Sequence, residues 1–194
     1  MARPRGFNSD EVAEALMNAF WLRGYGHTSL PDLVSATGLL RGSLYAAYGD
    51  KEGMFAVAID SYLAHLRAEL ASDAKGIEGI REMLDAVVRI TADDPDRRGC
   101  LLINAIPETG FVGAANAEAV NAGLQEMHRR VRKRLAEAQA ASSQMPDLDE
   151  LVAMVFASAV SIRVLGRAGQ SRVLLQQVAD GAVTSLRQAF DPGS

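Results

Sequence analysis

Apolar side chains in this chain recur at intervals of three and four residues, which is the period of an amphipathic α-helix. The first series runs through Val12, Leu16, Ala19 and Phe20. No window alternates apolar and polar residues at period two, and β-branched residues are never clustered. Alanine, leucine, glutamate and arginine dominate instead, and all four favour helices. The pattern therefore predicts an all-helical protein.

Cap residues and helix breakers set the expected boundaries. Ser29 and Asp50 are typical N-cap residues, whereas Gly24, Gly38 and Gly49 each follow the last position of an apolar series. Nine helices are expected, at about residues 9–23, 30–37, 41–48, 51–72, 77–92, 100–106, 116–141, 147–167 and 171–190.

Residues 28–55 carry the most informative pattern. Two short helices are joined by residues 37–40, with Gly38 where a left-handed conformation is needed. Apolar positions on both helices can face a core. The second helix is then left with an outer face suited to the DNA major groove. This outer face is expected to carry Arg41, Gly42, Ser43, Tyr45 and Tyr48.

The chemistry of this face suits DNA. Arg41 has the fork geometry for a guanine edge or a phosphate, and the tyrosine hydroxyls can reach phosphate oxygens. Gly42 and Ser43 are small enough for a close approach to the base edges. Lys51 opens the next helix, where its ammonium and the N-terminal amides can bind a phosphate. The alternative is that these are ordinary surface residues of a helical hairpin.

The stretch AFWLRGYGHTSLPDLVSATGLLRGSLYAAYGDKEGMF resembles the tetracycline-repressor family of bacterial regulators. The resemblance covers about residues 6–55. It includes the aromatic-then-Gly-Tyr end of the first helix, the Thr-Ser before the second, the Gly-Ser-Leu-Tyr of the third and the Lys-Glu that opens the fourth. It implies a helix-turn-helix DNA-binding domain at residues 1–50 and a helical effector-binding and dimerisation domain at residues 51–194.

The same resemblance implies a homodimer that pairs through the last two helices, at about residues 147–190. It also implies a repressor that binds a palindromic operator and is released by a small-molecule effector. Thr28 joins the expected DNA-binding residues. Arg3 and Arg5 are expected either to contact the minor groove or a phosphate, or to form a tail with no role.

Cys100 is the single cysteine, at the expected start of a short helix just after Arg97 and Arg98. The helix dipole and the two cations would favour the reactive thiolate. In regulators that this chain resembles, a cysteine in a Gly-Cys-Leu context senses electrophiles or oxidants. The alternative, which we favour, is a small buried hydrophobe at a helix start.

An effector cavity is expected farther along the chain. Asn104 and Glu108 follow Cys100 by four and eight residues and can place polar groups in it. Its apolar lining is expected from Met83, Val87, Phe111 and Met127. The alternative for the two polar residues is helix capping or hydrogen bonding to nearby backbone groups.

Composition places the chain among globular proteins, since 48% of its residues are hydrophobic. The longest apolar stretch, residues 151–165, is interrupted by Arg163 and is too short to span a membrane. The first residues, MARPRGF, do not resemble a signal peptide. One cysteine excludes an intrachain disulfide. A cytoplasmic protein without a membrane partner is expected.

Net charge does not identify a DNA-binding protein here. The chain carries a formal charge of −4, and residues 1–52 hold five basic and six acidic side chains. Only the surface that meets phosphates must be positive, so the position of each charge matters more than the sum. A sequence-indifferent DNA-binding protein is disfavoured by the same acidic balance.

Motifs for catalysis or cofactor binding are not found. The sequence has no P-loop, nucleophile elbow, paired-cysteine site or His-Glu zinc motif. The histidines His27, His65 and His128 match no metal-binding spacing. Neither an enzyme nor a cofactor is therefore expected. The competing interpretations are a thiol-based sensor acting through Cys100 and a helical ligand-binding protein without DNA function.

Overall fold

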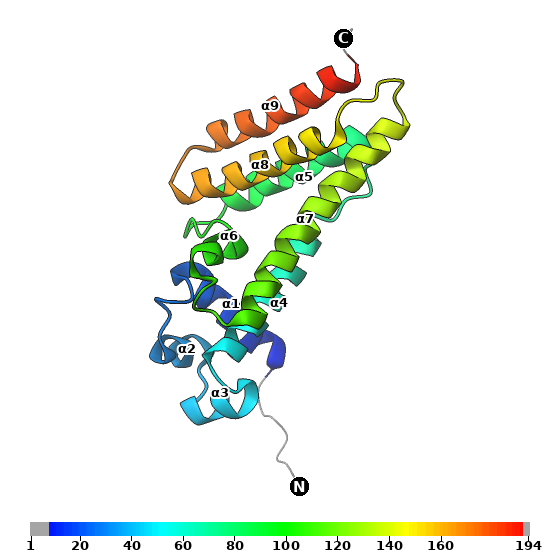
Figure 1. The fold of residues 1–194 in the computed structure, drawn as a ribbon. Helices are drawn as coiled ribbons and strands as arrows, with labels where there is room; N and C mark the ends of the chain where they lie inside the picture. Colours follow the sequence, from blue (N-terminus) through cyan, green and yellow to red (C-terminus); the bar gives the residue numbers. More distant parts are fainter. Residues whose placement is uncertain (1–7, 192–194) are drawn as a thin grey trace.

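The computed structural model describes residues 8–191, which form nine α-helices and one 3₁₀ turn and contain no strand (Figure 1). The all-helical prediction is confirmed. The elements are α1 (Ser9–Arg23), α2 (Leu30–Thr37), α3 (Arg41–Tyr48), α4 (Lys51–Glu69), α5 (Gly76–Ala92), α6 (Leu101–Ala105), η1 (Ile106–Glu108), α7 (Ala114–Ala140), α8 (Leu148–Arg167) and α9 (Arg172–Phe190).

The helices form two ends joined by two long helices (Figure 1). Helices α1, α2 and α3 gather at one end, and α5, α8 and α9 lie at the other. Helices α4 and α7 run between them, with α4 packed against α1 and α7 packed against α5 and α8. The N-terminal end is thus built onto α4, which is separated from α3 by only two residues.

Aromatic pairs fix α1 on α4. The Phe20 and Phe55 ring centroids lie 5.0 Å apart, and those of Trp21 and Tyr62 lie 4.9 Å apart, both pairs edge to face. This geometry is favourable beyond the area that the rings bury. The pairs belong to one core that continues between the two ends, so α1 and α4 are packed together over their apolar faces.

Helix ends differ from the sequence prediction at three places. Helix α4 ends at Glu69, three residues before the expected end. Helix α7 starts at Ala114, after Gly113 with φ +82°. The segment expected as one helix at 100–106 is α6 followed by η1, because Pro107 lacks the donor needed to continue an α-helix. None of the helices within residues 8–191 combines the length and apolar character of a membrane span.

Candidate nucleic-acid interface

Local capping explains the shape of α2. The Ser29 hydroxyl accepts a hydrogen bond from the Asp32 backbone N–H at 3.3 Å, and the Asp32 carboxylate accepts one from the Ser29 N–H at 2.8 Å. The hydrogen bond from the Ser29 hydroxyl contributes most to lowering the pKa of Asp32 below its ordinary value. Helix α2 ends at Gly38, whose φ of +66° permits the tight turn into α3.

Helix α3 is anchored by one side of its surface. Leu44, on α3, and Leu33, on α2, are completely buried. The opposite side of α3 faces solvent, as predicted, and exposes Arg41, Gly42, Ser43 and Tyr45. The Arg41 guanidinium carbon lies 5.5 Å from the centroid of the Tyr45 ring. The arrangement leaves a guanidinium, two hydroxyls and an open glycine on a helix that a groove can receive.

One residue expected on this surface lies elsewhere, and a second is only partly exposed. Thr28 is fully buried, and its hydroxyl donates to the Gly24 carbonyl at 2.6 Å, so the prediction that it faces DNA is wrong. The threonine closes the loop between α1 and α2 instead. Tyr48 is half-buried and packs partly against the core, and its contact with DNA stays a prediction.

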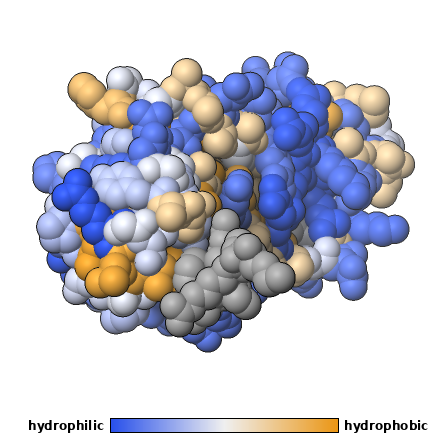
Figure 2. Space-filling model, turned by 90° about the horizontal axis from the view of Figure 1, so that it is seen from below, coloured by the Kyte–Doolittle hydropathy of each residue, from blue (hydrophilic) through white to orange (hydrophobic). Residues whose placement is uncertain are grey.

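The sequence analysis missed Leu40 as a surface residue. It is the N-cap residue of α3, and 77% of it is exposed. Figure 2 looks onto this end of the molecule and shows apolar surface beside hydrophilic surface, rather than a uniformly charged face. The hydrophobic pattern could not reveal Leu40, because a leucine next to a helix start is normally read as part of the core.

Lys51 lies at the start of α4, as expected, but its ammonium is 4.3 Å from the centroid of the Tyr25 ring. Partial burial lowers the pKa of Lys51, and the nearby carboxylate of Glu108 opposes this effect. The Asp50 carboxylate accepts a hydrogen bond from the Gly53 N–H at 2.8 Å. One N-terminal amide of α4 is therefore already occupied, and a phosphate contact by Lys51 stays a prediction.

Glu108 connects the helical body to the DNA-binding end. Its two carboxylate oxygens accept hydrogen bonds from the backbone N–H groups of Tyr25 and Gly26, both at 2.8 Å. The prediction that Glu108 lines an effector cavity is thus wrong, since its side chain is committed to the loop after α1. The pair is separated by more than 80 residues in sequence, so no local pattern could have indicated it.

The other residues expected around a cavity are divided. Met83 and Met127 line an apolar cavity together with Val87, as expected. Phe111 does not line it, because 77% of this residue is exposed. Asn104 lines a neighbouring cavity, and its side-chain amide donates to the Arg98 carbonyl at 2.7 Å.

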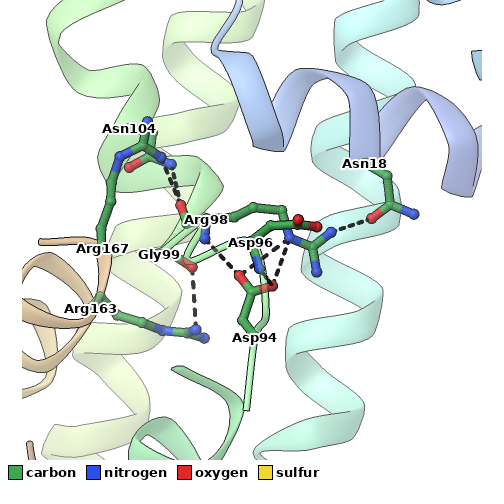
Figure 3. A network of polar contacts seen from close by, with 8 residues as sticks. All are labelled: Asn18, Asp94, Asp96, Arg98, Gly99, Asn104, Arg163 and Arg167. Atoms are coloured by element: carbon green, nitrogen blue, oxygen red, sulfur yellow. Dashed lines mark hydrogen bonds and ion pairs between the residues drawn. The ribbon is translucent and has the colours of Figure 1, made fainter. Parts of the chain in front are cut away.

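Cys100 is buried and precedes the five residues of α6. The expectation that Arg98 stands beside the thiol is wrong. Its guanidinium instead contacts Asp94 and donates to the Asn18 side chain at 2.7 Å (Figure 3). It also lies 4.1 Å from the centroid of the Trp21 ring. Burial therefore favours the interpretation of Cys100 as a small core residue.

Arg3 and Arg5 lie outside the described residues 8–191. Their contact with the minor groove stays a prediction.

Comparisons with known proteins cover most of the chain. A family model described as "Bacterial regulatory proteins, tetR family" matches residues 12–58. A second, described as "Tetracyclin repressor-like, C-terminal domain", matches residues 76–182. The two matches coincide with the N-terminal helices and with the helical body.

Similar proteins point to the same class. The HTH-type transcriptional repressor ComR of Escherichia coli (strain K12) is 30% identical over 196 residues, with 95% of this chain and 90% of the relative covered. A solved structure of a cysteine mutant of the TetR family regulator CifR, complexed with 26-base-pair operator DNA, is 30% identical. Its TM-score is 0.82, with 94% of this chain and 99% of that chain covered. A TetR regulator from Chloroflexus aurantiacus has 23% identity, a TM-score of 0.80 and coverage of 91% and 92%, and supports the fold.

Proposed function

Because this chain belongs to the TetR family of bacterial transcriptional regulators, we propose that it is a homodimeric repressor that binds a two-fold symmetric operator and releases it when a small molecule enters the helical body. The membership confirms the prediction of a DNA-binding regulator rather than an enzyme. The observation that carries the proposal is the exposed outer face of α3, held rigid by Leu44 beneath it. A relative named as a repressor and a neighbour bound to operator DNA support it.

Different residues of the α3 face are suited to contact the DNA bases and the DNA backbone. Arg41, on the first turn, is positioned for a guanine edge or a phosphate, and Tyr45 for a phosphate oxygen. Leu40 offers an exposed apolar side chain at the same end, which suits a thymine methyl group. The acidic net charge does not oppose this binding, because only the surface that meets phosphates must be positive.

The test is selection of DNA sites from a random library by the purified protein. A two-fold symmetric consensus is expected. Arg41→Ala should weaken binding to it by about 1–3 kcal/mol, the usual loss when an arginine that reads a base is removed. Arg129→Ala is the matched control, because Arg129 is an exposed arginine on α7, outside α2 and α3. A non-symmetric or sequence-indifferent selection, or equal losses in the two variants, contradicts the proposal.

The dimer face is proposed on α8 and α9. Within one protomer α8 exposes Ala153, Ala157, Ser161 and Val164, which recur on one side of the helix, and α9 exposes Val173. Val164 is 49% and Val173 68% exposed, although both are apolar. Small residues at helical spacing allow the close approach that a four-helix contact between two protomers needs.

Glutamate substitutions on this face test the dimer without disturbing the protomer. Ala157→Glu and Val173→Glu change exposed positions, so each protomer should keep its helicity. Light scattering is expected to show monomers, with weaker operator binding because one half-site offers fewer contacts. Ala122→Glu, an exposed change on α7, is the control. A wild type that is monomeric at micromolar concentration removes this part of the proposal.

Communication between the two ends is proposed to pass through contacts of the segment around α6. Arg98 donates to Asn18 of α1, and Glu108 binds the loop after α1. The Asn116 side-chain amide donates to the Glu52 carbonyl of α4 at 3.0 Å. A ligand that moves this segment therefore changes the support of α1 and α4, and with it the position of α3. The protein is expected to act in the cytoplasm, where such an operator lies.

A further inference from the structure

Arg163 is a buried cation without an anionic partner. The residue lies on α8 and is only 6% exposed. Its guanidinium donates one hydrogen bond, from Nη1 to the Gly99 carbonyl at 3.3 Å (Figure 3). Within residues 8–191 no carboxylate forms an ion pair with it. A guanidinium removed from water is costly unless an opposite charge and further hydrogen bonds compensate it.

The acidic residues of the adjoining loop form no ion pair with Arg163, and Asp93 pairs with Arg172 instead. Asp94 accepts hydrogen bonds from the Arg98 backbone N–H at 2.7 Å and from the Arg98 side chain at 3.1 Å. Figure 3 shows Arg98, between Asp94 and Asn18, turned away from the Arg163 guanidinium. The carboxylate of Asp94 is thus paired with Arg98, and within residues 8–191 no ion pair joins Arg163 to an acidic side chain.

Arg163 opens onto a cavity of about 300 Å³ between the α6 segment and the end of α8. Two of the lining residues are arginines, Arg163 and Arg167, and none is acidic. The Asn104 amide and the Arg167 guanidinium both donate to the Arg98 carbonyl, at 2.7 and 2.8 Å (Figure 3). Apart from Cys100 and Asn104, the remaining lining is apolar, from Ile103, Pro107 and Val164.

A second, apolar cavity adjoins the first and is much smaller, with a volume of about 50 Å³. Both are lined by Cys100, Ile103 and Arg163, and the second continues between α5, α7 and α8 past Met83 and Phe156. Apart from Arg163 and Cys100, its lining consists of aliphatic, aromatic and methionine side chains. A molecule that enters from the first cavity meets cations at the entrance and apolar surface beyond them.

We propose that these adjoining cavities bind a small organic carboxylate with an apolar body, whose carboxylate pairs with Arg163 and whose apolar part lies toward Met83 and Phe156. The inference rests on the proposed function, since it names the chemical class of the effector. The carboxylate supplies the missing charge, and Arg167 is the second cation that lines the first cavity. Thiol modification of Cys100 is not required for this binding.

A ligand that also pairs with Arg167 changes a contact that supports the DNA-binding end. Arg167 and Asn104 are the two side-chain donors to the Arg98 carbonyl, while the Arg98 guanidinium holds Asn18 of α1. A ligand that draws Arg167 away removes one of these donors. The loop that carries Arg98 then loses part of its support, and the contact with α1 changes.

The experiment titrates the purified full chain with octanoate and benzoate by calorimetry, with octanamide and octylamine as uncharged and cationic counterparts. Octanoate and benzoate should bind, and octanamide and octylamine should not. Arg163→Met should weaken carboxylate binding about 30-fold or more, as expected when one partner of a buried charge pair is removed. Arg89→Met is the control, because Arg89 is an exposed arginine on α5 that pairs with Glu69.

The melting temperature without ligand separates this role from a structural one. Arg163→Met should melt no lower than wild type, because an apolar side chain replaces an uncompensated buried charge. A markedly lower melting temperature, equal carboxylate binding by Arg163→Met, or no binding of either carboxylate overturns the inference. Operator binding without ligand is measured separately. If no carboxylate binds but the operator does, only this inference is refuted. If no operator binds, the proposed repressor function is refuted.

Discussion

The contact of Glu108 with the loop after α1 gives a test of how the helical body supports the DNA-binding end. The two carboxylate oxygens accept hydrogen bonds from the N–H groups of Tyr25 and Gly26. A Cβ atom at position 26 would lie 2.9 Å from one carboxylate oxygen, and one at Gly24 would lie 3.1 Å from the other. A side chain at either position would therefore crowd the carboxylate, and the φ of +81° at Gly24 also favours glycine there.

Removal of this carboxylate has a magnitude that follows from the two bonds. A hydrogen bond to a charged acceptor contributes about 1.5–3 kcal/mol, and partial exposure of Glu108 favours the lower value. Glu108→Ala should then cost about 3 kcal/mol of local stability, or about a 100-fold loss of protection at the two amides. Glu108→Gln keeps one acceptor oxygen and should lose about half of that free energy.

Hydrogen exchange of the backbone amides of Tyr25 and Gly26 measures this effect directly, and urea denaturation measures its share of global stability. Glu118→Ala is the matched control, because Glu118 is an exposed glutamate on α7. Exchange rates at the two amides that are the same in wild type and Glu108→Ala would show that the carboxylate does not hold the loop, and the reasoning would fail.

Three further changes test single features of the site and the core. Leu44→Ala, at a fully buried position, should lower the free energy of unfolding measured in urea by about 2–5 kcal/mol, as is typical of a buried leucine cut back to alanine. Leu40→Ala, at an exposed position, should lower it little. Asp32→Asn should destabilise the protein at neutral pH, because hydrogen bonds from Ser29 lower the pKa of Asp32 below its ordinary value of 3.8. The stabilisation by the carboxylate is present above pH 3.8 and is lost as the pH falls through the lowered pKa. The stabilities of variant and wild type should therefore converge in acid. Cys100 should react with a thiol reagent slowly in the native protein and rapidly in urea, since it is 7% exposed; fast native reaction would restore the thiol-sensor interpretation.

Local signals in the sequence predicted most of the helices. Ser29 caps α2 through its own side chain, and Asp50 caps α4 in the same way, as their residue types indicated. Gly38 adopts the left-handed conformation that the turn before α3 needs. Such signals act over three or four residues, and therefore a single sequence contains them completely.

Contacts between distant segments explain what the sequence did not reveal. Thr28 stands directly before the N-cap of α2, but its burial depends on the Gly24 carbonyl at the end of α1. The hydrogen bonds of Glu108 leave no local signal, because their partners lie more than 80 residues earlier. Arg163 appears in the sequence as an interruption of an apolar stretch. That interruption was itself the available signal, since a charge inside an apolar run on a buried helix requires a partner.

Arg98 links the candidate effector site to the DNA-binding end through both of its polar parts. Its carbonyl accepts from Asn104 and Arg167, and its guanidinium holds Asn18 and Asp94. An effector changes operator affinity only if it binds two arrangements of the protein with different free energies. Couplings between sites are usually about 1–3 kcal/mol, which is the size of one or two hydrogen bonds to a charged group. Loss of the bond between Arg98 and Asn18 is therefore sufficient in magnitude, without any large rearrangement of the helices. By reciprocity, DNA that favours the arrangement with this bond intact must weaken effector binding by the same factor.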